Sequence, residues 1–183
     1  MLVLGVDEVG RGCLAGPVVA CACVLDDNFF SAEIKDSKKL SEKKRDSLYD
    51  YIISNCVDYS FGVICNEIID SVNILNATKQ AMHIAINGIT SNYDKVVVDA
   101  VKLNNIKKPM EHPFKAEDKF LSVAAASILA KVYRDNLMKK LHIYYPEYLW
   151  YKNKGYGTKE HIDAIKKYGV TPLHRRSFLG EII

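Results

Sequence analysis

The chain begins with an apolar strand pattern, residues 2–6, that runs directly into Asp7 and Glu8. Two adjacent carboxylates at the end of a buried strand repel each other, and a bound cation relieves that repulsion. A glycine stands on each side of Arg11, so backbone amides can approach an anion that a larger side chain would block. Carboxylates that can bind a metal therefore stand beside amides and a guanidinium that can bind a phosphate. This combination predicts metal-assisted phosphodiester chemistry. An ordinary surface turn after a strand is the alternative, because Asp and Gly are common in turns.

The rest of the chain alternates strand patterns with helix patterns. The periodicity predicts strands over residues 2–7, 17–25, 57–63 and 95–99, and helices over 42–55, 71–89, 120–141 and 159–168. No internal repeat or low-complexity linker divides the chain. We therefore expect one α/β domain over residues 1–183, with a helical C-terminal segment from about residue 140.

The composition is that of a globular protein, with 49% apolar and 26% charged residues. The longest apolar runs, such as residues 17–25, are far too short to cross a membrane. The first residues enter a strand pattern without a basic region or an apolar signal core, so secretion is not expected. The five cysteines include no CxxC pair and are expected to be reduced thiols. A cytoplasmic location without membrane association is the expectation that follows.

Positive charge gathers in the last third of the chain. Residues 131–176 hold 11 Lys or Arg and only 4 Asp or Glu side chains, whereas the whole chain carries a net charge of +3. Tyrosines and the single tryptophan lie among these basic residues. Basic groups mixed with aromatic rings suit a nucleic-acid surface, where charge meets phosphates and rings meet sugars and bases. A solvated pair of helices with an aromatic core is the alternative.

Three further acids stand at the ends of predicted elements. Asp99 ends a short buried strand pattern, and Glu117 and Asp118 precede the long helix. If the strands of Asp7 and Asp99 lie side by side, their acids meet at one edge of the sheet. Carboxylates about 4 Å apart repel by roughly 4 kcal/mol per pair near the protein surface, and divalent cations remove that repulsion. Oxygen ligands favour Mg²⁺ or Mn²⁺ over Zn²⁺; taken singly, each acid also fits an ordinary turn or helix start.

Two motifs near the C-terminus offer contacts for a nucleic acid. Tyr156 stands between two glycines, where an exposed ring packs on a sugar and its hydroxyl reaches a 2′-OH or a phosphate. Arg175 and Arg176 belong to a basic cluster suited to backbone phosphates. A buried tyrosine in a helix-capping turn and a solvated basic tail are the respective alternatives.

These motifs resemble those of the type 2 ribonucleases H, specifically ribonuclease HII of bacterial character. The similar segments are residues 5–17 (GVDEVGRGCLAGP), 36–40 (DSKKL), 73–82 (NILNATKQAM), 97–100, 124–135 (AAASILAKVYRD) and 154–178 (KGYGTKEHIDAIKKYGVTPLHRRSF). The resemblance implies the ribonuclease H-like fold, a central mixed β-sheet flanked by helices with a small helical C-terminal part. It also implies an endonuclease that hydrolyses the RNA strand of RNA–DNA hybrids and nicks 5′ of ribonucleotides embedded in duplex DNA. Two-metal-ion hydrolysis with Mg²⁺ or Mn²⁺ would leave 3′-hydroxyl and 5′-phosphate ends.

The resemblance also implies roles for individual residues. Asp7, Glu8 and Asp99 correspond to the first three metal-binding carboxylates. The backbone of residues 10–12 corresponds to the motif that senses the 2′-OH at the RNA-to-DNA junction, and Tyr156 to the tyrosine that packs on the junction sugar. The substrate-binding set expected from these motifs is Gly10, Arg11, Gly12, Lys38, Ser127, Tyr156, Arg175 and Arg176.

The fourth acid departs from the family pattern, in which an aspartate follows Lys-Gly or Ala. Here residues 115–119 read KAEDK. Counting back ten residues from Ser127 places Glu117 on the catalytic position and Asp118 one residue beyond it. We favour Glu117 as the metal ligand and keep Asp118 as the alternative catalytic acid, because Glu is one methylene longer than Asp.

The hypothesis is therefore a monomeric, Mg²⁺- or Mn²⁺-dependent ribonuclease H that acts on RNA–DNA hybrids and on ribonucleotide-containing duplex DNA. Another enzyme of related fold, such as a DNA-junction nuclease or a kinase, is one alternative, although the sequence contains neither a Walker loop nor a GxGxxG motif. A noncatalytic hybrid-binding module is the second alternative. The presence of acids at all four expected positions argues against it.

Overall fold

The computed structural model describes residues 1–29, 31, 33–34 and 40–183. Lys38, which the sequence motifs suggest as a substrate contact, lies outside the described residues. Within these ranges, five strands form one sheet in the order β3-β2-β1-β4-β5. The strands are β1 (Val3–Val9), β2 (Val18–Leu25), β3 (Asp58–Ile64), β4 (Lys95–Val98) and β5 (Met110–Glu111).

The helices begin and end close to where the sequence predicts them. They are α1 (Glu42–Asn55), α2 (Asn66–Val72), α3 (Ile74–Asn87), α4 (Leu121–His142), α5 (Trp150–Asn153) and α6 (Lys159–Tyr168), with 3-10 turns η2 (Ala116–Asp118), η3 (Pro146–Tyr148) and η4 (Arg176–Phe178). Ser41 and Thr158 cap α1 and α6, because each side-chain oxygen accepts a hydrogen bond from a first-turn amide. Gly169 ends α6 with a φ of +80°.

The sheet is mixed, with β1 in the middle. β1 pairs antiparallel with β2 and parallel with β4, so that Val6 lies opposite Val98 on β4. β2 pairs antiparallel with β3, and β5 extends the sheet beyond β4. The predicted α/β class with a central mixed sheet is therefore confirmed.

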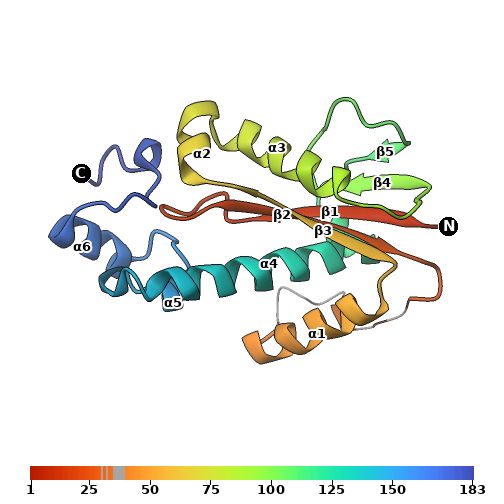
Figure 1. Ribbon diagram of the computed structural model, residues 1–183, viewed down its shortest axis with the longest axis horizontal. Coiled ribbons are helices and arrows are strands. Elements are labelled where there is room, and N and C mark those ends of the chain that lie inside the picture. Colours follow the sequence, from red (N-terminus) through yellow and green to blue (C-terminus); the bar gives the residue numbers. More distant parts are fainter. Residues whose placement is uncertain (30, 32, 35–39) are drawn as a thin grey trace.

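Helices cover both faces of the sheet. Figure 1 shows α2 and α3 on one face and α1 and α4 on the other. Alternate residues of β2 serve the two cores, because successive strand side chains point to opposite faces. Ala20 and Ala22 pack toward α3, whereas Cys21 and Cys23 pack toward α1 and α4.

The central strand touches the first turn of α4 without a side chain between them. A Cβ added at Gly5 would lie 2.2 Å from the carbonyl carbon of Ser122, a distance that no real side chain tolerates. The missing side chain therefore allows β1 and α4 to run together. This contact brings the C-terminal end of β1 alongside Ser127 in the second turn of α4.

The C-terminal segment packs against the loop that joins β1 to β2. In Figure 1 this segment lies at the end of the sheet where that loop emerges. Their shared apolar cluster includes Leu14 and Ala15 of the loop, Met138 of α4, Trp150 of α5 and Ile165 of α6. The C-terminal helices therefore support the loop that follows Asp7 and Glu8.

Among the described residues, no helix is long and apolar enough to cross a membrane. All five cysteines are free thiols, as expected. The helix predicted from residue 71 begins later, at Ile74, because Asn73 adopts a φ of +70° and separates it from α2. Neither α2 nor β5 was predicted, because both are too short to show a clear period.

Candidate active site

The parallel pairing of β1 and β4 brings the first three acids together. Asp7 and Asp99 directly follow the paired residues Val6 and Val98, and the N–H of Asp99 donates to the Val6 carbonyl at 3.1 Å. The Asp99 carboxylate in turn accepts a hydrogen bond from the N–H of Ala116 at 2.8 Å. One edge of the sheet therefore gathers β1, β4 and the turn η2, as the sequence predicts.

Asp7 lies in a buried and crowded environment. Its exposed fraction is 7%, and its carboxylate accepts hydrogen bonds from the Glu8 N–H at 2.8 Å and from the Ser127 hydroxyl. Burial, followed by the negative charges of Glu8 and Asp99, raises the pKa of Asp7 well above its ordinary value. A nearby cation would reverse this effect, because it stabilises the charged carboxylate.

Glu8 divides its two oxygens between different environments. Oε1 accepts a hydrogen bond from the Arg11 guanidinium at 3.3 Å, whereas Oε2 is buried and receives no hydrogen bond from the described residues. Burial raises the pKa of Glu8, and Arg11 opposes the rise. A buried carboxylate oxygen without a donor is costly, so Oε2 is a suitable ligand for a cation.

The two candidates for the fourth acid, Glu117 and Asp118, lie in different environments. Glu117 is 6% exposed in η2, next to the amide that binds Asp99, whereas Asp118 is exposed. The turn η2 leads directly into α4, which carries Ser127 toward Asp7. Of the two candidates, only Glu117 therefore lies on the buried side of this segment.

The donor set fits a hard divalent cation. Asp7, Glu8, Asp99 and Glu117 offer carboxylate oxygens, the ligands that Mg²⁺ and Mn²⁺ prefer. In this conformation no three His, Cys, Asp or Glu side chains of the described residues lie close enough together to share an ion. Glu8 Oε1 instead contacts Arg11 at 3.3 Å.

The glycine-flanked loop lies immediately beyond these acids. Arg11 and Gly12 are exposed, whereas Gly10 is buried with a φ of +89°. Arg175 lies beneath the loop, fully buried, and donates to the carbonyls of Gly10 at 2.6 Å and Arg11 at 2.8 Å. Arg175 Nε also donates, to the Gly16 carbonyl at 2.9 Å, so all three guanidinium nitrogens bind the main chain. The prediction that Arg175 contacts phosphates at the surface is therefore wrong.

Tyr156 lies across from this loop. It forms an isolated antiparallel bridge with Cys13, and its ring lies 5.7 Å from Lys131 Nζ and 5.8 Å from the Arg134 guanidinium carbon. Its exposed fraction is 36%, and burial is the main cause that raises its pKa to about 12. One part of the ring therefore packs on cationic side chains and another part remains open to solvent.

Comparison with known proteins shows the family to which the chain belongs. The family model described as Ribonuclease HII matches residues 4–180. This chain belongs to the ribonuclease HII family. The chain is therefore a ribonuclease H, and the resemblance seen in its sequence motifs is confirmed.

Individual relatives extend over nearly the whole chain. Ribonuclease HII of Pediococcus pentosaceus is 50% identical over 177 residues, which are 97% of this chain and 69% of that protein. The crystal structure of ribonuclease H2 from Pyrococcus horikoshii OT3 superposes with a TM-score of 0.83 at 28% identity, over 100% of this chain and 97% of that one. Bst-RNase HIII in complex with Mn²⁺ shares the fold with a TM-score of 0.73 at 20% identity, over 92% of this chain and 63% of that one. The expected ribonuclease H-like fold is confirmed.

In this member of the ribonuclease HII family, two buried histidines support the Tyr156 segment. The Tyr156 carbonyl accepts from His161 Nδ1 at 2.8 Å, which leaves Nε2 of that ring to accept from Trp150 Nε1 at 3.1 Å. His174 Nδ1 accepts from the Thr171 N–H at 2.9 Å, so its Nε2 carries the proton and shares the lone pair of His161 Nε2, 3.2 Å away, with Trp150. The partners fix both tautomers, and both rings are neutral. Burial lowers both pKa values, that of His174 to about 4.

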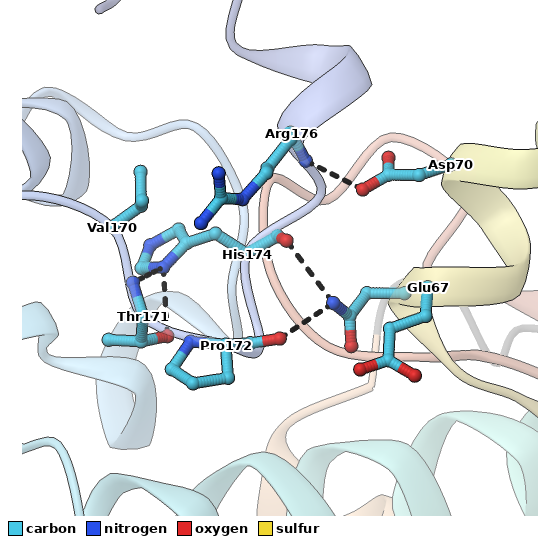
Figure 2. Close-up of a pocket in the computed structure, with 8 residues that line it drawn as sticks. Glu67, Asp70, Val170, Thr171, Pro172, His174 and Arg176 are labelled. Atoms are coloured by element: carbon cyan, nitrogen blue, oxygen red, sulfur yellow. Dashed lines mark hydrogen bonds between the residues drawn. The ribbon is translucent and has the colours of Figure 1, made fainter.

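Arg176 lies at a different surface from its buried neighbour. Figure 2 shows a pocket between α2 and residues 170–176, lined in part by Arg176. Its volume is about 380 Å³. The N–H of Arg176 donates to Asp70 at 2.9 Å, and the Asn66 amide donates to the Pro172 carbonyl at 2.8 Å. The basic cluster seen in the sequence is therefore split between one buried arginine and one exposed arginine.

Sequence reasoning missed Arg134 and the histidine pair of this ribonuclease HII site. Arg134 is fully buried and donates to the carbonyls of Ala15, Pro17 and Lys154. It lies in the charged second half of the helix pattern, among residues 131–140, and this pattern gives no signal that Arg134 is buried. His161 and His174 show no metal-ligand spacing, and only the fold brings them together.

Proposed function

We propose that this chain hydrolyses the RNA strand of RNA–DNA hybrids and nicks duplex DNA on the 5′ side of embedded ribonucleotides. Water attacks the phosphorus and the bond to the 3′ oxygen breaks, which leaves 3′-hydroxyl and 5′-phosphate ends. The observation that carries the proposal is the meeting of Asp7 and Asp99 through the β1–β4 pairing, directly beside the exposed backbone of residues 11–12. Acids for hydrolysis and donors for a ribose lie at one edge of the sheet.

Asp7, Glu8, Asp99 and Glu117 are proposed to hold Mg²⁺ or Mn²⁺, with two ions bound during hydrolysis. Divalent ions in such sites supply the charge that activates water and stabilises the leaving oxygen. The raised pKa of Asp7 and the donor-free Oε2 of Glu8 support this assignment, because both indicate carboxylates held close together away from water. Bst-RNase HIII, which shares the fold, is named as a Mn²⁺ complex.

The chain's own residues are proposed to orient the acids and the substrate. Ser127 donates to Asp7 and fixes the direction of its carboxylate. The Arg11 side chain is 44% exposed, so its guanidinium can leave the Glu8 carboxylate and bind a substrate phosphate instead. Gly12 presents its backbone to the ribose, and the open part of Tyr156 packs on the neighbouring sugar. Arg176 is proposed to contact the phosphate backbone farther along the duplex.

The setting of this activity is also part of the proposal. We expect the chain to act as a monomer and as one domain, in which the C-terminal helices share a core with the β1–β2 loop. We also expect it to work in the cytoplasm on duplex nucleic acid. The excess of basic residues over 131–176 supports a surface for phosphates near the site.

A nicking assay tests the proposal. The substrate is a labelled DNA duplex with one ribonucleotide, incubated with Mg²⁺, with Mn²⁺, or with a chelator. We expect one nick 5′ of the ribonucleotide with either metal and none with the chelator. Asp7→Asn is expected to lower kcat by at least about a thousandfold while duplex binding persists, because it removes one ligand charge without removing the surface.

Asp46→Asn is the matched control, because Asp46 is an exposed aspartate on α1. It is expected to cut at the wild-type rate. Normal cutting by Asp7→Asn would show that the acids at this sheet edge do not carry the reaction. Metal-independent binding with no cleavage of any hybrid would instead favour a noncatalytic module.

A further inference from the structure

Two arginines beneath the β1–β2 loop are unusual in their burial. Arg134 and Arg175 both have an exposed fraction of 0%. Neither forms an ion pair with a carboxylate among the described residues, and all their hydrogen bonds go to main-chain carbonyls. Burying a charged group without a carboxylate partner costs free energy. The hydrogen bonds to main-chain carbonyls offset this cost, and they tie both arginines to particular backbone segments.

Together the two side chains connect three segments. Arg175 donates to residues 10, 11 and 16 of the β1–β2 loop from its place beyond α6. Arg134 donates from α4 to the Pro17 carbonyl at 2.8 Å, to the Ala15 carbonyl at 3.0 Å, and to the Lys154 carbonyl at 2.7 Å. The loop and the segment of Tyr156 are therefore held by the same guanidinium groups.

Peptide geometry converts these hydrogen bonds into an orientation for the loop amides. In a trans peptide, the carbonyl and the following N–H point in opposite directions. The Gly10 carbonyl points at Arg175, so the N–H of Arg11 points away from it. The Arg11 carbonyl also points at Arg175, which turns the N–H of Gly12 outward. Both amides belong to exposed residues, and neither donates to another described residue.

Packing adds a second constraint on the same loop. A Cβ added at Gly10 would lie 2.2 Å from Arg134 Nε, so the loop backbone rests directly on that guanidinium. The same group lies 5.8 Å from the centre of the Tyr156 ring. One side chain therefore sets the spacing between the loop and the tyrosine.

We propose that Arg134 and Arg175 are positioning residues that hold the Arg11 and Gly12 amides outward, at a fixed distance from Tyr156, to recognise a ribose hydroxyl. The inference deepens the proposed function and rests on it. Arginine suits this role because its planar fork reaches several carbonyls at once, whereas a lysine ammonium acts as a single point of contact. Neither arginine touches the substrate.

Arg175→Lys and Arg134→Lys test the proposal, because they keep the charge and remove the fork. The control is Arg45→Lys, since Arg45 also donates to a main-chain carbonyl, that of Leu40, but lies on α1. Two measurements are made: kcat and KM on the one-ribonucleotide duplex with an all-DNA duplex as competitor, and hydrogen exchange of peptides covering residues 10–17. The second measurement does not depend on activity.

Each arginine variant is expected to raise KM about tenfold, which corresponds to the loss of about one or two hydrogen bonds to the ribose. Its kcat is expected to stay within about threefold of wild type, and the inhibition constant of the all-DNA competitor to stay unchanged. Exchange over residues 10–17 is expected to be faster than in wild type and in Arg45→Lys. A merely structural role would lower the active fraction, and so kcat, without changing KM.

Unchanged KM and unchanged exchange in Arg175→Lys and Arg134→Lys would overturn the proposal, as would a fall in kcat alone. If both variants fail to fold, Gly12→Ala decides the matter, because nothing lies within 4 Å of its added Cβ. This variant is expected to fold and to raise KM by a similar factor. An unchanged KM would refute the claim that the Arg11 and Gly12 amides point outward to bind the ribose. Absence of nicking by the wild type would defeat the proposed function, while the exchange measurement would still judge the positioning.

Discussion

Acid is expected to destabilise the protein through the buried histidine pair. The pKa of His174 falls from the ordinary 6.5 to about 4, chiefly through burial and then through His161. Below pH 6.5 the unfolded chain binds a proton that the folded chain rejects, so stability is complete above that pH and is lost as the pH falls toward 4. A depression of this size corresponds to about 3 kcal/mol when the loss is complete, and to about 2 kcal/mol at pH 5.

Urea unfolding at a series of pH values between 8 and 4.5 measures this loss. Trp150 is the single tryptophan and donates to His161, so its fluorescence reports on the pair directly. The matching shift in melting temperature is about 4 to 8 °C at pH 5. His174→Gln removes the titrating ring and is expected to flatten the profile, although it also weakens the fold at every pH.

Comparing variants separates the pH dependence of stability that comes from His174 from the pH dependence that comes from the acids. Asp7, whose pKa is raised, contributes with the opposite sign and becomes more favourable as the pH falls. His112→Gln is the control, because His112 is exposed, and it is expected to follow the wild-type profile. Equal pH profiles for wild type and His174→Gln would refute the inference that the buried ring must stay neutral.

Two further predictions concern the fourth acid and the sheet. Glu117→Gln is expected to lower kcat in the nicking assay at least about tenfold more than Asp118→Asn, because only Glu117 is buried, next to the Ala116 amide that binds Asp99. Equal small losses would contradict the choice of Glu117. Gly62→Ala is expected to lower the free energy of unfolding in urea by about 3 kcal/mol, because its Cβ would lie 1.9 Å from an α3 carbonyl oxygen. Gly180→Ala, with nothing within 4 Å, is expected to change it by less than about 0.5 kcal/mol.

The sheet edge could be predicted from the sequence because it follows from local patterns. Asp7 and Asp99 each follow an apolar strand pattern, and the ends of neighbouring parallel strands meet at one sheet edge. The structure supplies the remaining condition, the parallel pairing of β1 with β4. Ser127 also falls within a long helix pattern whose first half is largely apolar. Its contact with Asp7 depends on Gly5, whose missing side chain lets α4 approach the central strand.

The support of the loops could not be predicted in the same way. Arg175 is next to Arg176 in the sequence, and both resemble a surface basic cluster, yet one is buried and the other exposed. The carbonyls that bind Arg175 lie more than 150 residues away in the chain. No local period encodes such contacts, because the chain must first fold to bring them together. The same reason hides Arg134 and the histidine pair.

The central place of β1 has a consequence for how an active molecule comes into being. The strand that carries Asp7 is made before its parallel partner β4, which follows after about 90 further residues and about 5 to 20 seconds of synthesis. A chain interrupted before β4 contains only Asp7 and Glu8 of the four proposed metal ligands. On the proposed function, an incomplete chain would therefore not hydrolyse nucleic acid until β1 and β4 have paired, which is a slow, long-range step.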